Sequence, residues 1–392
     1  MKYLMRILIF NVFLTHSALS DAAITLNQPN KHNLAIVIDA GSTGSRLHIY
    51  QLPDPKKPTS RINELYLNQV SPGINASIND IRATSEHLAS LFNPAQRFCY
   101  QQKLNCADAP IHFLSTGGVR LERRSKQQQL YQIVRNWIED FTIFKHVVEV
   151  RTISGEEEAL LGWMGAYERQ SRNNQAVGAY FELGGASMQY AYIVEDPKAA
   201  NVTINYPKRK AIHLKVGSWL GFGLNEATKR VVNYWLESHE NCYPKGFYLS
   251  QPFNYPKCFS YFDHYLSSNI DFNALATVIS KVIERKQPIV LTSSFKYFFE
   301  DYFDTKQPAT FQQALKSTCQ MSWNDLRANP KYANMISYHN ESACANGTYI
   351  LALFKMLGLP PNYPNYIFNK SDWSEAVQTY WKLKKAKKIL IN

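Results

Sequence analysis

The sequence predicts an α/β protein made of two halves, each a mixed β-sheet flanked by helices. The first observation is a repeat: AIVIDAGSTGSRLHIYQL near the start and AYFELGGASMQYAYIV near the middle both read as apolar strand, acidic residue, glycine-rich turn and second strand. The second is length, because 392 residues exceed one ordinary core and favour two domains of comparable size. The third is element order, since in each half paired strands precede strands that alternate with helices.

The first half runs from its hairpin to a glutamate-rich helix. A linker rich in Pro and Lys follows the hairpin at 52–60, and a helical stretch follows at 78–92. The strand IHFLS then ends at Thr116, and 127–140 has helical periodicity. After the strand VVEVRTI, the segment SGEEEALLGWMGAYERQ begins with Ser154 as an N-cap and has glutamates in its first turn.

The second half begins with the second hairpin. A strand follows at 211–216, then a helix from Asn225 and a loop-rich region at 238–260 that holds two cysteines. A strongly periodic helix at 270–285, the buried strand PIVLTSS and an apolar helix at 349–357 complete it. We expect the ligand site in a cleft between the halves.

The N-terminus has the layout of a secretory signal over residues 1–23. Lys2 and Arg6 precede an apolar run at 7–14, and small residues follow. The run is too short to span a bilayer, and no later stretch reaches spanning length without charges. We therefore expect a secreted or periplasmic protein without a transmembrane anchor once the signal is removed; a buried N-terminal helix is the alternative.

Six cysteines in an exported chain predict disulfides. None of them has C-x-x-C spacing, which argues against zinc and thioredoxin-type chemistry. Six cysteines allow about fifteen connectivities. Proximity along the chain favours three neighbouring pairs: Cys99–Cys106, Cys242–Cys258 and Cys319–Cys344.

The net charge of +12 is dispersed except for a lysine-rich C-terminal tail. A composition of 45% hydrophobic and 19% charged residues argues against disorder. Dispersed charge favours polyanions only weakly, so we expect no nucleic-acid partner, and the tail reads as a solvated helix end. Nucleotides would benefit from a mildly positive surface.

The glycine-rich turns predict phosphate binding. A tight turn between two strands exposes unpaired backbone N–H groups that an anion can occupy. Two such turns that face each other would make a phosphate clamp. Neither turn has the G-x-x-x-x-G-K pattern that a P-loop requires, so P-loop chemistry is not expected.

Five stretches resemble, in order and spacing, the five apyrase conserved regions of the nucleoside triphosphate diphosphohydrolases. The resemblance implies an actin-like fold of two ribonuclease-H-like domains, and hydrolysis of nucleoside tri- and diphosphates with Mg²⁺, Ca²⁺ or Mn²⁺. CYPKGF and CANGTYIL also resemble family segments, which supports the pairs Cys242–Cys258 and Cys319–Cys344. The five stretches are DAGSTGSR (39–46), STGGVR (115–120), SGEEEALLGW (154–163), ELGGASMQ (182–189) and SWLGFGLNEA (218–227).

The resemblance also implies domain limits. The first lobe would comprise 34–163 together with 365–392, because the C-terminal helix of relatives returns to the first half. The second lobe would comprise 164–364. The segment SDWSEAV departs from the usual family pattern before that helix.

We expect the protein to be a monomeric, secreted member of this family, of bacterial origin.

Four residues receive catalytic roles from the resemblance. Glu158 would be the base that accepts the proton of the attacking water. Ser187 and Gln189 would orient this water, and Thr116 would place a hydroxyl beside the phosphates. The residues alone leave alternatives, because glutamates at a helix start complement its dipole and polar residues can line the solvated side of a hairpin.

The other site residues follow from the same motifs. Asp39 and Glu182 would hold a divalent ion, mainly through its waters. The family has aspartate where Glu182 stands, one methylene shorter, which affects the distance to the metal. Tyr349 would stack on the nucleobase, or else is a core tyrosine in an apolar helix. The phosphates would be held by Ser42, Thr43, Gly44, Ser45, Arg46, Gly184, Gly185 and Ala186.

We therefore expect a secreted apyrase that removes terminal phosphates from nucleoside tri- and diphosphates and stops at the monophosphate. An exopolyphosphatase-type hydrolase on the same fold is one alternative. A nucleotide-binding actin-like module without rapid hydrolysis is another.

Overall fold

The structure, a computed structural model, describes residues 33–54, 61–171, 177–234, 240–247, 251–305, 307–333, 335, 337–369 and 373–391. The predicted signal peptide, 1–23, lies outside these residues. The part of the chain from His32 to Asn392 groups as one compact unit, and it alone is described below.

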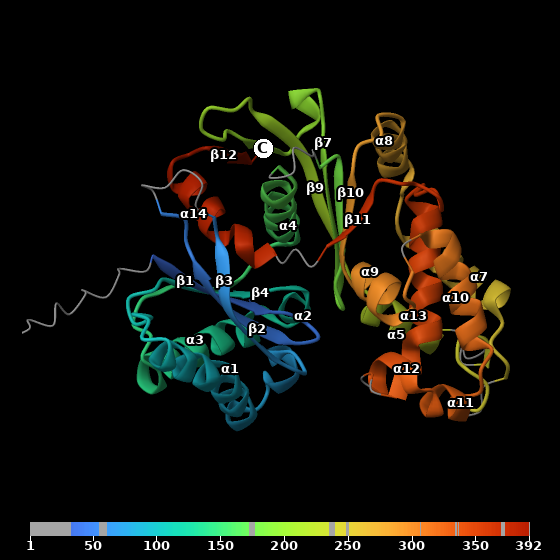
Figure 1. Cartoon of the computed structure of the whole chain (residues 1–392), viewed down its shortest axis with the longest axis horizontal. Helices are drawn as coiled ribbons and strands as arrows, with labels where there is room; N and C mark the ends of the chain where they lie inside the picture. The colour runs from blue at the N-terminus through green and yellow to red at the C-terminus, as the bar shows by residue number, and fades with distance from the viewer. Residues whose placement is uncertain are drawn as a thin grey trace, which may run out of the picture. The chain divides into compact units, whose positions relative to one another are not determined.

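Two mixed sheets form the framework (Figure 1). The first has the strand order β3-β2-β1-β4-β5, and the second has the order β11-β10-β6-β7-β9-β8-β12. The predicted α/β class with mixed sheets is confirmed. The strands are β1 (Leu34–Ala40), β2 (Ser45–Gln51), β3 (Asn63–Val70), β4 (Ile111–Ser115), β5 (Val147–Thr152), β6 (Ala179–Leu183), β7 (Ser187–Ile193), β8 (Val202–Ile204), β9 (Ile212–Leu220), β10 (Ile289–Ser293), β11 (Tyr366–Asn369) and β12 (Ile389–Ile391).

Helices cover the outer face of each sheet. In Figure 1, α1 and α3 lie below the first sheet, whereas α7, α10 and α13 gather beside the second. The helices are α1 (Ile81–Gln101), α2 (Gly117–Arg120), α3 (Arg124–Phe141), α4 (Gly155–Ser171), α5 (Leu224–Tyr234), α7 (Tyr255–Asn269), α8 (Asn273–Glu284), α9 (Ser294–Lys296), α10 (Pro308–Cys319), α11 (Trp323–Ala328), α12 (Pro330–Ala333), α13 (Ser337–Met356) and α14 (Val377–Lys385), with the short helices η1 (Ile74–Ser77), η2 (Pro197–Ala199), η3 (Tyr297–Tyr302) and η4 (Trp373–Ala376).

The two hairpins have the same register, as the sequence repeat suggests. Asp39 pairs with Arg46 between β1 and β2, and Glu182 pairs with Gln189 between β6 and β7. Directly opposed residues of an antiparallel pair project from the same face of the sheet. Each acidic residue therefore shares its face with the residue across the turn.

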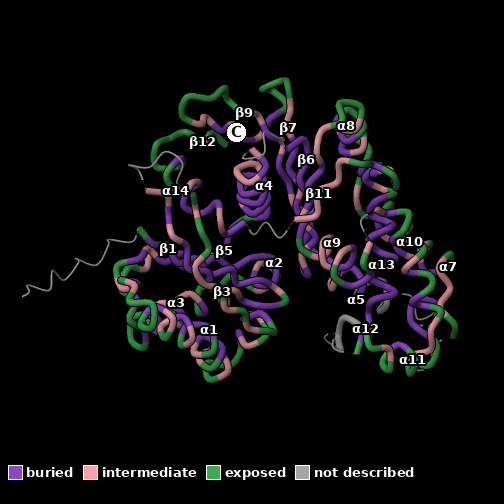
Figure 2. The backbone as a smooth tube through the Cα atoms, in the orientation of Figure 1, coloured by how far each residue is buried: buried purple, intermediate pink, exposed green. Residues whose placement is uncertain are grey.

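Helix α4 lies between the two sheets and is buried along most of its length (Figure 2). Its Trp163 belongs to a hydrophobic cluster that also contains Val37 from β1, Tyr180 from β6 and Val216 from β9. A helix that is apolar on nearly all sides has to be buried on all sides, which explains this position. The predicted boundary between lobes, at 163/164, falls inside this helix.

The C-terminal segment 365–392 contributes to both sheets. Strands β11 and β12 extend the second sheet. Helix α14 and η4 instead lie against the first, where the hydroxyls of Tyr50 and Ser374 are 2.6 Å apart and Gln378 bonds Nε2 of His112 at 2.8 Å. The limits of the lobes remain a prediction.

The predicted disulfides Cys99–Cys106, Cys242–Cys258 and Cys319–Cys344 are confirmed. The first joins the end of α1 to the loop before β4, and the others lie in the helical part beside the second sheet. Within the described ranges, no helix is both long and apolar enough to cross a membrane.

Gly162 tests how closely α4 packs on the second sheet. A Cβ atom at this position would collide with the ring of Tyr180, which is fully buried and donates its hydroxyl to Glu182 at 2.9 Å. We expect Gly162→Ala to lower the free energy of unfolding by about 1–3 kcal/mol, measured by urea denaturation.

Gly347→Ala is the matched control, because Gly347 is also a helical glycine. The nearest atom to its new Cβ would be a methyl group of Leu315 at 2.6 Å, which can rotate away, and alanine favours a helix. Equal losses for the two variants would contradict the argument that the Tyr180 ring fixes this contact.

Candidate active site

Glu158 lies in the first turn of α4, with 5% of its surface exposed, and forms an ion pair with Arg120. Nη1 of Arg120 is 2.7 Å from Oε2 of Glu158 and also donates to the carbonyl of Ile153 at 3.1 Å. Arg120 ends α2, the short helix after β4. A buried carboxylate is thus held by a cation from a neighbouring element.

Two side chains of β7 complete this cluster. The amide of Gln189 donates to Oγ of Ser187 at 2.7 Å, to Oε2 of Glu158 at 3.1 Å and to Oγ of Ser218 at 3.2 Å. Arg120 also donates to Oγ of Ser187, at 2.8 Å. The carbonyl oxygen of Gln189 is buried and has no hydrogen-bond partner among the described residues.

Burial raises the pKa of Glu158 above its ordinary value, and the adjacent Arg120 partly opposes this shift. The direction follows from the cost of moving a charged carboxylate out of water. A general base works best when its pKa lies near the operating pH, so this shift suits a carboxylate that accepts a proton.

The structure separates the three consecutive glutamates that sequence alone left equivalent. Glu156 is exposed, whereas Glu157 accepts two hydrogen bonds of 2.7 Å from Arg151. Only Glu158 faces the cluster with Arg120. The pair Arg151–Glu157 attaches the first turn of α4 to β5 and so helps to fix the direction of Glu158.

Arg151 also forms a second, half-buried ion pair. Its Nε donates to Glu149 at 2.6 Å, and Glu149 lies 2.6 Å from Nδ1 of His112. Burial alone would raise the pKa of Glu149, but its hydrogen bonds with His112 and Arg151 prevail and lower it to about 2. This carboxylate is therefore ionised and structural.

The two glycine turns lie against each other. A Cβ atom on Gly185 would be 2.7 Å from Cγ2 of Thr43 and 2.8 Å from Oγ of Ser42. The segment STGGVR (115–120) contacts both turns. A Cβ atom on Gly118 would be 2.8 Å from Cα of Ser42, and a Cβ atom on Gly117 would be 2.7 Å from Oγ of Ser187. Glycine leaves room here for these side chains and, at Gly118, for the backbone of Ser42.

Two hydroxyls lie in different surroundings: that of Thr116, predicted as a catalytic residue, and that of Ser45, predicted as a phosphate-binding residue. Thr116 is buried at the start of α2, where its N–H donates to the carbonyl of Ala40 at 3.2 Å. Ser45 is also buried, but its hydroxyl bonds Nε2 of His87 at 2.9 Å on the side of α1. The hydroxyl of Ser45 therefore points away from the turns.

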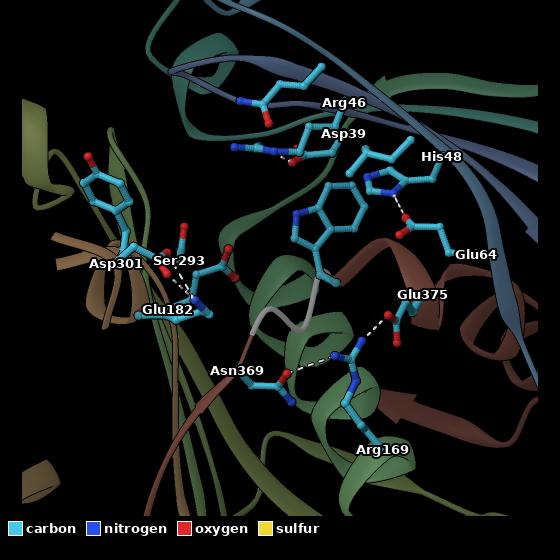
Figure 3. Close-up of a pocket in the computed structure, with 15 residues that line it drawn as sticks. Asp39, Arg46, His48, Glu64, Arg169, Glu182, Ser293, Asp301, Asn369 and Glu375 are labelled. Atoms are coloured by element: carbon cyan, nitrogen blue, oxygen red, sulfur yellow. Dashed lines mark hydrogen bonds and ion pairs between the residues drawn. The ribbon is translucent and has the colours of Figure 1, made fainter. Parts of the chain in front are cut away.

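Asp39 and Glu182 line one cavity of about 440 Å³ (Figure 3). Nη1 of Arg46 donates to Oδ2 of Asp39 at 3.1 Å, so this arginine is a partner of the carboxylate. Oε2 of Glu182 accepts the Tyr180 hydroxyl. Among the residues that the structure describes, no three His, Cys, Asp or Glu side chains gather closely enough to hold an ion by themselves.

Tyr349 lies away from this cluster, in the helical core. It is fully buried, donates its hydroxyl to the carbonyl of Phe222 at 2.7 Å and has its ring centroid 5.3 Å from that of Phe262. This environment fits the packing interpretation of Tyr349 and offers no exposed ring face for a base.

Two residues of the cluster were not predicted as site residues. Arg120 is the last residue of the motif STGGVR, and Ser218 is the first of the motif SWLGFGLNEA. Ser218 is opposite Gln189 in the β7–β9 register, and a Cβ atom on Gly155 would collide with it. Only strand pairing, which sequence reasoning did not assign, could have placed Ser218 here.

Comparison with known proteins identifies the family. Residues 25–363 match the GDA1/CD39 (nucleoside phosphatase) family. The chain is 25% identical over 301 residues to a nucleoside-triphosphatase of Pisum sativum, with 70% of this chain and 63% of that protein covered. It is 26% identical over 238 residues to apyrase 1 of Arabidopsis thaliana, which covers 56% of this chain and 50% of that protein. It is 27% identical over 225 residues to a guanosine-diphosphatase of Schizosaccharomyces pombe, which covers 52% of this chain and 38% of that protein. The chain thus spans 38–63% of the length of these three relatives.

Solved structures share the fold. A nucleoside triphosphate hydrolase structure from Neospora caninum superposes with a TM-score of 0.59 at 14% identity, covering 86% of this chain and 88% of that chain. An exopolyphosphatase from Cytophaga hutchinsonii superposes with a TM-score of 0.54 at 14% identity, covering 90% and 98%. The predicted actin-like fold is confirmed. Since the family match extends over most of the sequence, this chain belongs to the GDA1/CD39 (nucleoside phosphatase) family.

Proposed function

We propose that this protein is an exported apyrase that hydrolyses nucleoside triphosphates and diphosphates to the monophosphate. The observation that carries the proposal is the buried Glu158, bonded to Arg120 and Gln189, beside glycine turns that face each other. Terminal phosphoryl transfer to water needs positioning, charge neutralisation and a base, and little else.

In this proposal Glu158 accepts a proton from the attacking water. Ser187 and Gln189 orient this water, because a hydroxyl and an amide can each donate and accept hydrogen bonds. The unpartnered, buried carbonyl oxygen of Gln189 supports the role, since it can accept the second hydrogen of the water.

The phosphates are held alongside the two turns, which contact each other at Gly185, Ser42 and Thr43. Backbone N–H groups of 41–44 and 185–186 supply fixed donors that need no reorganisation as charge develops on the phosphate oxygens. The N–H of Gly184 instead donates to the carbonyl of Ser187 at 3.0 Å. The hydroxyls of Ser42, Thr43 and Thr116 add donors from the first turn and from the start of α2.

A divalent ion fits the cavity beside the turns. Asp39 and Glu182 are hard oxygen ligands that line the same cavity, and Mg²⁺ commonly binds through one or two carboxylates while it keeps several waters and takes substrate oxygens. When bound, the ion would neutralise phosphate charge. The extra methylene of Glu182, relative to the family aspartate, would affect which ion binds best.

Export remains part of the proposal. The three disulfides support an oxidising compartment, because such bonds persist there. The predicted signal peptide lies outside the described residues.

Phosphate release tests the function directly. Purified protein should release inorganic phosphate from nucleoside tri- and diphosphates, and EDTA should abolish this release. Hydrolysis of polyphosphate in preference to ATP would favour an exopolyphosphatase. Binding of ATP with no more than a single slow turnover would favour a non-hydrolysing module and contradict the proposal.

Glu158→Gln should lower kcat for phosphate release by about 10²–10⁴-fold, because the amide cannot accept the proton of water. Nucleotide affinity, measured by calorimetry, should remain within a few-fold of the wild type. Glu156→Gln is the matched control: it changes the same side chain in the same helical turn, at an exposed position, and should retain activity. Near wild-type turnover by Glu158→Gln would refute its role as base.

Arg120→Ala should destabilise the protein in a manner that depends on pH. The pKa of Glu158 is raised in the folded state, so its ionisation reduces stability as pH rises through the range between the ordinary and the raised pKa. Loss of Arg120 removes the cation that opposes this shift. We expect a loss of about 3–5 kcal/mol at about pH 8, where an unpaired charge is buried, and a smaller loss at about pH 5, measured by urea denaturation.

The same substitution in the Glu158→Gln background is the control, since no carboxylate remains there to be left unpaired. The loss caused by Arg120→Ala should then be the same at both pH values. If Arg120→Ala lowers stability equally at both pH values in the protein that keeps Glu158, the ion pair is not the cause of the destabilisation.

A further inference from the structure

Ser293, the last residue of β10, has an unusual backbone conformation. Its φ of 60° and ψ of −123° lie in a region that residues with a side chain rarely adopt. Such strain persists only where the surrounding structure imposes it, and it is frequent at functional sites. Of the non-glycine residues with positive φ in the described chain, Ser293 alone lines the cavity of Asp39 and Glu182.

The hydroxyl of Ser293 has no role in the local structure. Ser293 occupies the N-cap position of α9, where a serine usually accepts a hydrogen bond from the first turn with its backbone in the β region. Here the side chain makes no capping hydrogen bond, and the residue is exposed. Neither the helix nor the core therefore accounts for a serine at this position.

The register places Ser293 at the end of β10, opposite Leu183 of β6. Thr292 is opposite Glu182 between β10 and β6, and Ser293 follows it. In Figure 3, Glu182 and Ser293 lie on one side of the cavity, whereas Asp39 and Arg46 lie on the other. A hydroxyl and two carboxylates from three different strands thus line one space.

The positively charged side chains Arg46, Arg169 and Lys296 that line this cavity each have an acidic partner, and that of Arg169 is Glu375. Arg46 bonds Asp39, as described above. Lys296 Nζ lies 2.9 Å from Asp301 and 3.3 Å from Glu300.

We propose that Ser293 is a third contact of the divalent-ion site at Asp39 and Glu182, with its hydroxyl oxygen accepting a hydrogen bond from a water bound to the ion. The inference rests on the proposed function and extends it. A hydrated ion held mainly through water needs acceptors around its water shell, and a hydroxyl provides one without adding charge. The strained backbone is the structural cost of presenting this hydroxyl.

Two substitutions separate the strain from the hydroxyl. Ser293→Ala removes the hydroxyl and keeps a residue with a Cβ atom at positive φ, so Tm should not change. Ser293→Gly also relieves the strain and should raise Tm by about 2 °C. The affinity of the full chain for Mn²⁺ should fall about threefold to tenfold in both variants. It is measured by EPR of free Mn²⁺, with and without a non-hydrolysable ATP analogue.

Lys286→Gly is the matched control, because Lys286 also has positive φ (52°) and does not line the cavity. Its Mn²⁺ affinity should equal that of the wild type. If Asp39→Asn weakens Mn²⁺ binding while both Ser293 variants bind like the wild type, the inference is wrong and the proposed ion site stands. If Asp39→Asn also leaves Mn²⁺ binding unchanged, the ion site of the proposed function fails as well.

Discussion

The burial of the Glu158 carboxylate is the constraint on which the site depends. An ionised carboxylate without partners cannot be buried at acceptable cost, so the fold has to bring a cation and donors to it. Arg120 comes from the element after β4 of the first sheet, whereas Gln189 comes from β7 of the second. Because both reach the same oxygen, the carboxylate links the two sheets at the point where the glycine turns meet. Its raised pKa follows from the same burial.

Helix α4 makes this burial possible. It packs between the sheets, and two of its glycines leave room for Ser218 and Tyr180 to approach its backbone. The first turn of the helix is also fixed from outside by the bidentate pair of Arg151 with Glu157. The position of Glu158 is thus set by packing along the helix and by a neighbouring ion pair. The predicted boundary between lobes, at 163/164, falls within this helix, which packs against both sheets.

Sequence predicts best what local pattern determines. Strand alternation and a repeated turn were enough to predict both hairpins, and proximity predicted the three disulfides. The order of β1, β4 and β5, and the opposition of Ser218 to Gln189, depend on pairing between distant segments, so no local pattern specifies them. Helical spacing likewise could not tell Glu157 from Glu158, because the difference lies in which arginine each one meets. Tyr349 was ambiguous for a similar reason: an apolar helix contains the same residue whether its ring packs in a core or stacks on a ligand.

The two hairpins share a register but carry different chemistry, and the difference has a physical reason. Position 46 is an arginine that neutralises Asp39 across its turn, whereas the corresponding position 189 is a neutral amide opposite Glu182. Gln189 also bonds Glu158. An arginine at 189 would place a second cation beside Glu158 and lower its pKa, which would make it a poorer base in the proposed reaction. An amide can donate to the carboxylate and still offer an acceptor oxygen to water, which a guanidinium cannot. The two hairpins therefore carry a charged partner at 46 and a neutral one at 189, and the neutral one suits the base role proposed for Glu158.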